Sequence, residues 1–242
     1  MENVVLLGGI FVVPTLFLAI GLKLSGRVVH WIPLLWAGLA FVLYVALLKS
    51  RALLPVPALL QDLPLIWFGK LLSLAGTIVM IYFIPRVSYR DIGLTWSQRE
   101  GSLPLVAIAG AITTICAVGT SWLFTYNPNT ALENILFQAI LPGIDEELFF
   151  RGLLLLLLHQ AFEKDLKIFG AHTGWGFWIV VAVFGLLHGV GLKDDGAISI
   201  NIGAIISTGF TGFMLTWMRE RTGSLVVPIV FHNTFNVAMA FV

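Results

Sequence analysis

Long apolar stretches dominate this chain and limit what it can fold into. A helix that spans a membrane needs about 20 consecutive, mostly apolar residues. Eight stretches meet that requirement, near 4–22, 28–48, 64–85, 103–124, 133–160, 175–192, 198–218 and 224–242. Lipid offers no hydrogen-bond partners, so each backbone amide has to be satisfied within its own segment. The sequence therefore predicts an all-α polytopic membrane protein, a bundle of about eight transmembrane helices in a single integral membrane domain over residues 1–242.

The composition agrees with this interpretation. Of the 242 residues, 58% are hydrophobic and 11% are charged, whereas soluble proteins carry about 25% charged residues. The net charge of +1 gives no indication of a nucleic-acid partner. The single cysteine, Cys116, lies in an apolar run, which excludes an internal disulfide. The first 24 residues lack a basic n-region and a cleavage site, so we expect a retained transmembrane helix there. The expected location is integral and multi-pass, in the cell membrane if the source is prokaryotic, with the lipid bilayer as a partner.

The basic residues predict an orientation. With eight spans, most of them fall in the loops after the first, third, fifth and seventh spans: Lys23, Arg27, Arg86, Arg90, Arg99, Lys164, Lys167, Arg219 and Arg221. The other side holds Lys49, Arg51, Lys70 and Lys193. The positive-inside rule then places both termini outside the cytoplasm. Lys70 is expected near a helix end, with its ammonium group reaching the headgroups.

Ionisable side chains inside apolar spans are costly and are candidates for function. They gather in three spans, as Asp145, Glu146, Glu147 and Arg151 in "GIDEELFFRG", His188 in "FGLLHGVG", and His232 with Asn233 and Asn236 in "FHNTFN". In an α-helix, Glu147 and Arg151 share a face and neutralise each other, while Glu146 points about 100° away. His232 and Asn236 share a face, and Asn233 is turned away.

These polar side chains are expected at similar depths in the membrane. Strict alternation of the spans puts Glu146, His188, His232 and Asn236 within about 5–20 Å of the same membrane side, at 1.5 Å per helical residue. We therefore expect an intramembrane polar cavity that opens to one side. A carboxylate beside a histidine in such a cavity is suited to activate water, and a second histidine beside an amide can stabilise an oxyanion. No G-x-S-x-G elbow supplies a serine nucleophile.

Three motifs resemble a known family. "EELFFR", "FGLLH" and "HNTFN" are similar, in order and spacing, to the EExxxR, FxxxH and HxxxN signature of the CAAX protease and bacteriocin-processing family, which contains the type II CAAX prenyl endopeptidases. The resemblance covers the C-terminal half, residues 133–242. It implies a membrane-embedded endopeptidase, a glutamate-type hydrolase without a metal or other cofactor, that acts on the C-terminal part of a peptide or protein, which can be prenylated.

The resemblance also implies roles for single residues. Glu146 is the general base and His188 its partner on the water, while His232 and Asn236 stabilise the oxyanion. Glu147 and Arg151 support the site, and Phe184 packs in the cavity wall. One expectation conflicts with the prenyl-protein members of the family. They act on cytosolic C-termini, whereas the basic residues place the cavity mouth on the other side.

Three alternatives remain open on the sequence. A zinc-dependent membrane protease would use Glu146, His188 and His232 as ligands with a fourth position open. A small transporter would use the buried charges as a proton path, although no inverted repeat is visible. A non-catalytic scaffold or bacteriocin-immunity protein would need none of this chemistry. Chelation, proton flux and the phenotype of site variants, respectively, distinguish these alternatives from the protease.

Overall fold

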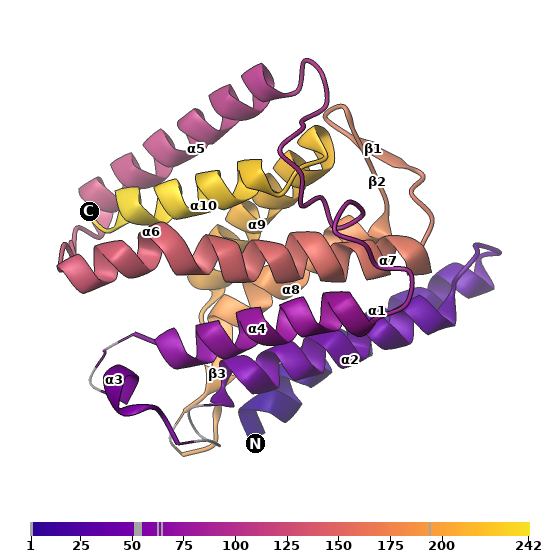
Figure 1. Ribbon diagram of the computed structural model, residues 1–242, viewed down its shortest axis with the longest axis horizontal. Coiled ribbons are helices and arrows are strands. Elements are labelled where there is room, and N and C mark those ends of the chain that lie inside the picture. The colour runs from indigo at the N-terminus through magenta and orange to yellow at the C-terminus, as the bar shows by residue number, and fades with distance from the viewer. Residues whose placement is uncertain (1, 51–54, 62, 64, 194) are drawn as a thin grey trace.

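Helices packed side by side form the body of the chain, with two short hairpins at their ends (Figure 1). The computed structural model describes residues 2–50, 55–61, 63, 65–193 and 195–242. Its helices are α1 (Glu2–Leu24), α2 (Trp31–Leu48), α3 (Ala58–Gln61), α4 (Trp67–Phe83), α5 (Leu103–Phe124), α6 (Leu132–Glu146), the π-helical segment η2 (Glu147–Leu154), α7 (Leu155–Ala161), α8 (Trp175–Gly189), α9 (Ile202–Thr222) and α10 (Val226–Met239). The expected all-α fold is confirmed. Two of the positions named above lie outside the described residues. They are Arg51, one of the basic residues that predict the orientation, and residue 64, the first residue of the expected span 64–85.

One helical rod, formed by α6, η2 and α7, runs through the middle of the bundle. It continues without a break from Leu132 to Ala161. Helices α2 and α4 pack on one side of it and α10 on the other, while α8 pairs with α9 (Figure 1). In η2 the backbone follows a wide π-helical turn, a feature often found at functional sites. The regular α-helix expected across 133–160 is therefore wrong from Glu147 to Leu154, the part that holds most of the first motif.

Close helix packing depends on glycine where α8 meets α9. A Cβ atom at Gly185 would lie 2.6 Å from the carbonyl oxygen of Ile205 and 3.1 Å from the Cα of Gly209. Any larger residue at position 185 would push the two helices apart. Small residues allow this approach in membrane bundles, and it fixes α8, the helix that carries His188.

The expected number of about eight spanning helices is not confirmed. Within the described residues, three stretches are able to cross a membrane by length and composition, namely Val5–Leu24, Trp31–Leu48 and Leu103–Phe124. Helices α4, α8 and α10 are apolar but shorter. The helices expected at 175–192 and 198–218 do not extend over their adjoining ends, which form a hairpin of β3 (Val190–Leu192) and β4 (Ile198–Ile200). A second hairpin, β1 (Leu166–Ile168) with β2 (Ala171–Thr173), joins α7 to α8.

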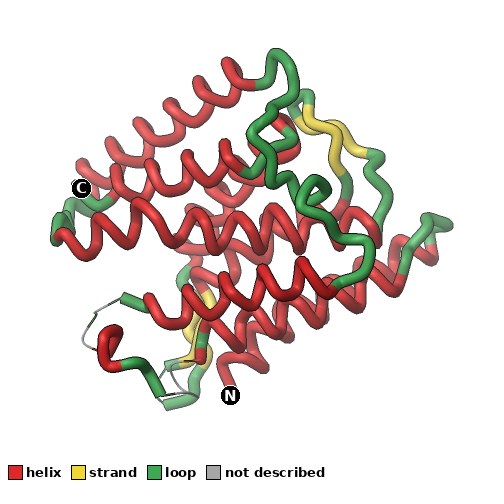
Figure 2. Tube along the Cα trace, viewed as in Figure 1, coloured by secondary structure: helices red, strands yellow, loops and turns green. Residues whose placement is uncertain are grey.

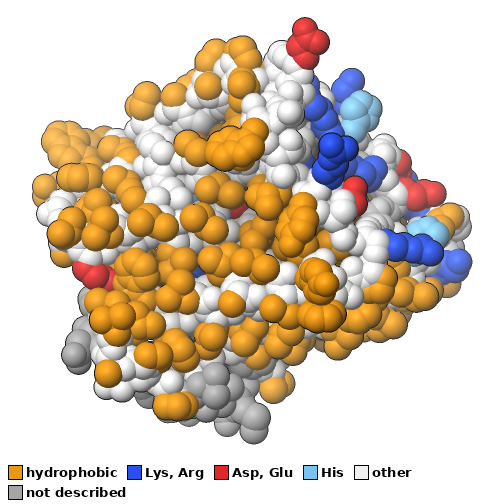
Figure 3. All heavy atoms as spheres, in the orientation of Figure 1, with side chains coloured by type: hydrophobic (Ala, Val, Ile, Leu, Met, Phe, Trp, Pro, Cys, Tyr) orange, Lys and Arg blue, Asp and Glu red, His pale blue; other side chains and the backbone are white. Residues whose placement is uncertain are grey.

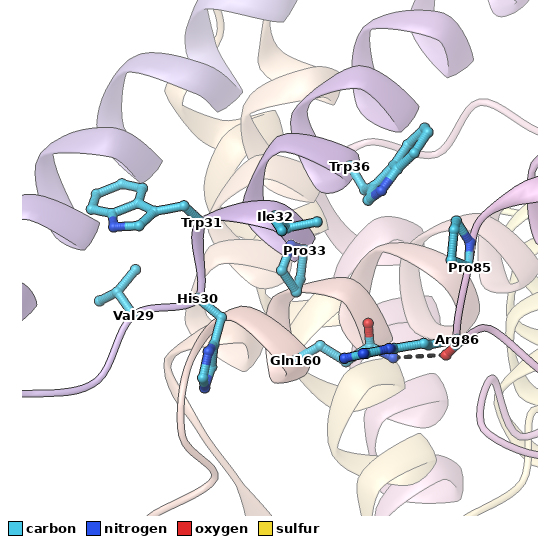
Figure 4. A pocket seen from close by; sticks show the side chains of 9 residues that line it. All are labelled: Val29, His30, Trp31, Ile32, Pro33, Trp36, Pro85, Arg86 and Gln160. Carbon is cyan, nitrogen blue, oxygen red and sulfur yellow. Dashed lines mark hydrogen bonds between the residues drawn. The ribbon is translucent and has the colours of Figure 1, made fainter.

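Apolar side chains cover most of the visible face, and charged side chains gather at one end (Figure 3). Such an apolar surface fits a protein that lies in a membrane. The charged end, here called the basic end, contains the end of α7, the hairpin β1–β2 and the long connection between α4 and α5, which Figure 2 shows as a loop crossing the bundle. Tryptophan side chains accompany the cations there. A hollow of about 800 Å³ is lined by Trp31 and Trp36 beside His30, Arg86 and Gln160 (Figure 4), a combination typical of a membrane–water interface.

Candidate active site

A polar cavity of about 330 Å³ lies inside the bundle, away from the basic end. It is lined from α4, α6, α8, α9 and α10 by Ile66, Lys70, Phe137, Gln138, Pro142, Glu146, Phe184, His188, Thr208, Thr211, His232, Phe235 and Asn236. Four of these are the residues for which the sequence predicts catalytic roles, and they come from α6, α8 and α10. The structure thus places Glu146, His188, His232 and Asn236 on one cavity.

Glu146 is the last residue of α6, and its side chain is only 11% exposed. Its Oε1 forms an ion pair and a hydrogen bond with the ammonium group of Lys70. Its Oε2 lies 4.0 Å from Nε2 of His232 and is buried without a hydrogen-bond partner among the described residues. One oxygen of this carboxylate is therefore held in place, and the other remains an acceptor on the cavity side.

Lys70 does not reach the headgroups, so the expectation that it snorkels is wrong. It lies in the first turn of α4 and is 4% exposed. Its Nζ bridges two carboxylates, that of Glu146 and that of Asp145, at 3.0 Å from Asp145 Oδ2. Because a buried ammonium needs compensating charge, the adjacent acids of α6 determine where it points.

Asp145 is a buried member of the site that the sequence-based assignment left without a role. Its carboxylate accepts hydrogen bonds of 2.8 Å from the hydroxyl groups of Tyr44 in α2 and Ser73 in α4. The sequence did carry a signal for α4, because Lys70, Ser73 and Thr77 are three and four residues apart and share one helical face. All three are buried. This polar face connects α4 to the acidic end of α6.

Glu147 and Arg151 form the ion pair that their spacing predicts. Nη1 of Arg151 lies 3.0 Å from Oε1 of Glu147, and both side chains are fully buried. The same carboxylate oxygen lies 2.7 Å from Nδ1 of His232. Arg151 also donates hydrogen bonds to the Thr216 hydroxyl and to the Gly212 carbonyl, both in α9. Glu147 therefore orients the imidazole of His232, and Arg151 fixes Glu147 against α9.

We expect Glu147→Gln to destabilise the protein by about 3–5 kcal/mol, since it leaves the guanidinium of Arg151 buried without its counter-charge. The free energy of unfolding, measured by denaturation in mixed micelles, checks this. The double variant Glu147→Gln/Arg151→Met serves as control, because removing both charges should recover part of the loss. A single variant as stable as the wild type would contradict the pairing.

His188 sits in the last turn of α8. Its Nδ1 lies 2.8 Å from the carbonyl oxygen of Phe184, so in the neutral imidazole Nδ1 donates and Nε2 is left to accept. The ring of Phe184 lies 4.7 Å from the His188 ring and 4.1 Å from the guanidinium carbon of Arg151. Phe184 thus lines the cavity and packs against both His188 and Arg151.

The two asparagines of the third motif differ in position. Asn236 lines the cavity one helical turn after His232. The Oδ1 atom of Asn233 accepts a 2.8 Å hydrogen bond from the backbone N–H of Gly143, and its Nδ2 donates to the Ile140 carbonyl. A Cβ atom at Gly143 would lie 2.4 Å from that Oδ1 atom. Asn233 therefore joins α10 to α6 outside the cavity, as the helical phase predicts.

Metal-ligating side chains do not converge in the described part of the chain, where no group of three or more His, Cys, Asp or Glu residues has an arrangement that would hold a metal ion. The polar groups that converge on the cavity include the free carboxylate oxygen of Glu146, the imidazoles of His188 and His232, and the amide of Asn236. These groups can accept a proton and donate hydrogen bonds to a developing negative charge.

Comparison with known proteins agrees with this arrangement. A family model described as "Type II CAAX prenyl endopeptidase Rce1-like" matches residues 128–238, a range that includes all three motifs and the helices α6, α8, α9 and α10. Neither a search of curated proteins nor one of solved structures returns a match. The matched family is a protease family, which supports a hydrolase, and together with the apolar helices it supports a membrane protein. The resemblance drawn from the three motifs is confirmed for residues 128–238, which match the model of the Rce1-like type II CAAX prenyl endopeptidase family.

Proposed function

We propose that the protein is an intramembrane endopeptidase that hydrolyses a peptide bond with water activated by Glu146 and His188. The observation that carries the proposal is the unpartnered Oε2 atom of Glu146, which faces the cavity 4.0 Å from Nε2 of His232. A buried carboxylate oxygen with no hydrogen-bond partner is a strong acceptor for a water molecule. The matched family supports this class of reaction.

The reaction balances with the residues of the cavity. Oε2 of Glu146 accepts a proton from the water, whose second contact is Nε2 of His188, and the water oxygen bonds to the scissile carbonyl carbon. The carbonyl oxygen becomes an oxyanion. When the intermediate collapses, the C–N bond breaks, and the leaving amine takes the proton from Glu146.

His232 and Asn236 stabilise the oxyanion in this scheme. Nδ1 of His232 donates to the Glu147 carboxylate, so Nε2 donates to an oxyanion only when the ring is an imidazolium. Asn236 supplies an amide N–H from the next turn of α10. Lys70, which is itself paired with Asp145, holds the first carboxylate oxygen of Glu146 and thereby positions the second.

The proposed substrate is the C-terminal part of a peptide or protein. The apolar side chains of Ile66, Phe137 and Phe235 line the cavity beside its polar groups, which favours a substrate that carries an apolar group such as a prenyl chain. The proposed mechanism needs no metal or other cofactor, and the lipid bilayer is the proposed surrounding of the enzyme.

Cleavage of a quenched fluorogenic farnesylated CAAX peptide by the purified protein in detergent tests the proposal. We expect cleavage by the wild type, unaffected by a zinc chelator, and a loss of about 10²–10⁴-fold in His188→Ala, as for removal of a group in acid–base catalysis. His172→Ala is the matched control, because His172 is exposed in β2 at the basic end.

Two results would count against the mechanism. Activity that a chelator abolishes and zinc restores would establish the zinc protease. A folded His188→Ala variant with full activity would remove His188 from the reaction. No cleavage by folded wild type would reject the prenylated substrate, and unmodified peptides would then be assayed with the same variants.

A further inference from the structure

A second polar cavity, of about 240 Å³, lies at the basic end of the bundle. It is separate from the candidate active site and lies between the ends of α7 and α9 and the connection between α4 and α5. Its lining consists of Arg90, Asp91, Arg99, Arg151, Leu155, Leu156, His159, Lys164, Arg219, Glu220 and Gly223. Four arginines and a lysine therefore face two carboxylates in one small space.

Both carboxylates are already engaged. Oε2 of Glu220, a residue that is 3% exposed, lies 2.9 Å from Nζ of Lys164 and 3.3 Å from Nε2 of His159. The carboxylate of Asp91 accepts a hydrogen bond from the Ser88 hydroxyl. Arg151 is paired with Glu147. Arg90, Arg99 and Arg219 form no ion pair among the described residues, and their three positive charges exceed the single negative charge of Asp91.

Arg219 is the most unusual of these cations because it is 8% exposed. Its guanidinium donates to the backbone carbonyls of Asp91, at 3.0 Å, and Ile92, at 3.3 Å. Arg99 donates to the backbone carbonyl of Glu220. Within the described residues, neither arginine has a carboxylate within ion-pair distance. Arg99 is exposed, but the guanidinium of Arg219 is buried without a counter-ion, which is unfavourable, so this arrangement calls for an anion.

The backbone holds both guanidinium groups in place. Gly93 has a φ of +83°, and a Cβ atom there would lie 2.4 Å from the guanidinium carbon of Arg219. A Cβ atom at Gly223, whose φ is +78°, would lie 3.4 Å from Nε of Arg99, an ordinary contact. Gly93 thus makes room for Arg219, the buried arginine of the cavity.

His159 provides an independent observation. Its side chain is 8% exposed and lines the cavity. Both ring nitrogens are buried without a hydrogen bond in the described part of the chain, and Nε2 lies 3.3 Å from Oε2 of Glu220. Buried polar atoms without a partner are rare in folded proteins. An occupant with oxygen atoms would supply the missing partner.

We propose that this cavity binds a phosphate-type oxyanion, either the phosphate of a lipid headgroup or free phosphate, with Arg99 and Arg219 as its principal ligands and His159 as a further donor. The planar guanidinium fork matches the geometry of phosphate oxygens. The cavity is large enough to admit a phosphate group. The cavity lies at the charged end of a membrane protein, where acidic headgroups are attracted to basic pockets.

Binding of inorganic phosphate to the purified full-length protein in detergent tests this site without any assay of peptide cleavage. Phosphate is titrated against chloride at constant ionic strength, and binding is followed by calorimetry and by the melting temperature. We expect saturable binding by the wild type and at least tenfold weaker binding by Arg99→Gln, whose side chain is exposed enough to be replaced without unfolding. Arg219→Gln should lose binding as well.

Arg221→Gln is the matched control, because Arg221 lies on the same helical turn as Arg219 but does not line the cavity. It should bind like the wild type. Nanodiscs of phosphatidylcholine with and without phosphatidic acid separate the two sources. Stabilisation by phosphatidic acid alone identifies a lipid headgroup, and stabilisation by inorganic phosphate identifies free phosphate. Absence of saturable binding from either source, or equal binding by Arg99→Gln, would overturn the proposal.

Discussion

Glu146→Gln is expected to reduce peptide cleavage by about 10³-fold or more while leaving the protein folded. The amide cannot accept the proton of the attacking water, and removal of a general base costs about 10²–10⁴-fold in rate. The fold should survive because Lys70 keeps its ion pair with Asp145, at 3.0 Å. The measurement is the rate of cleavage of the fluorogenic farnesylated peptide, together with the melting temperature and the elution profile of the variant.

Glu133→Gln is the matched control for that experiment. Glu133 lies in the first turn of the same helix and accepts a hydrogen bond from the indole of Trp67, outside the cavity. The same chemical change there should leave the rate within a few-fold of the wild type. If Glu146→Gln were folded and cleaved at the wild-type rate, Glu146 would not be the base.

Lys70→Met is expected to have the largest effect on stability. The substitution leaves Asp145 and Glu146 next to each other in the interior without their shared cation. Removing one partner of a buried ion pair costs about 3–5 kcal/mol, and here two carboxylates lose the same partner. We also expect cleavage to be lost, because the first oxygen of Glu146 is no longer held. The free energy of unfolding in mixed micelles and the cleavage rate measure the two effects separately.

Two further variants distinguish charge from packing in this prediction. Lys49→Met replaces an exposed lysine at the end of α2 and should change stability by less than about 0.5 kcal/mol. The double variant Lys70→Met/Asp145→Asn removes one of the two unpaired acids and should recover part of the loss. A Lys70→Met protein as stable as the wild type would mean that Lys70 reaches the headgroups after all.

The sequence predicts the helices well because helix formation in lipid depends on the apolar residues of the segment itself. An apolar stretch that lies in lipid has to form a helix, and the expected stretches 103–124 and 28–48 correspond closely to α5 and α2. Helix ends depend on more distant contacts. The adjoining ends of two expected spans pair as β3 and β4 because their backbones hydrogen-bond to each other across a turn, and apolar composition alone does not reveal such a pairing.

In the candidate active site, contacts within one helix are likewise predicted from the sequence, and contacts between distant residues are not. The ion pair of Glu147 with Arg151 and the outward position of Asn233 follow from spacing within one helix. The pairing of Lys70 with Glu146 joins residues 76 positions apart. Because Lys70 lies near the end of an expected helix, the sequence favours a contact with the headgroups instead. The second polar cavity, at the basic end, depends on the path of the connection between α4 and α5. The periodicity of helical residues gives no information about the path of such a connection.

The π-helical turn at η2 has a consequence for insertions and deletions. A π-helical turn contains one residue more than the α-helical hydrogen-bond pattern requires, so deleting one residue between Glu147 and Leu154 would restore a regular α-helix. The wider turn absorbs the extra residue, so the parts of the rod before and after the deletion would keep nearly the same orientation. Glu146 at one end and His159 at the other would still face their own cavities. A chain shortened by one residue here would keep its hydropathy and its helix content, and the deletion would change only the local geometry by which Arg151 contacts α9.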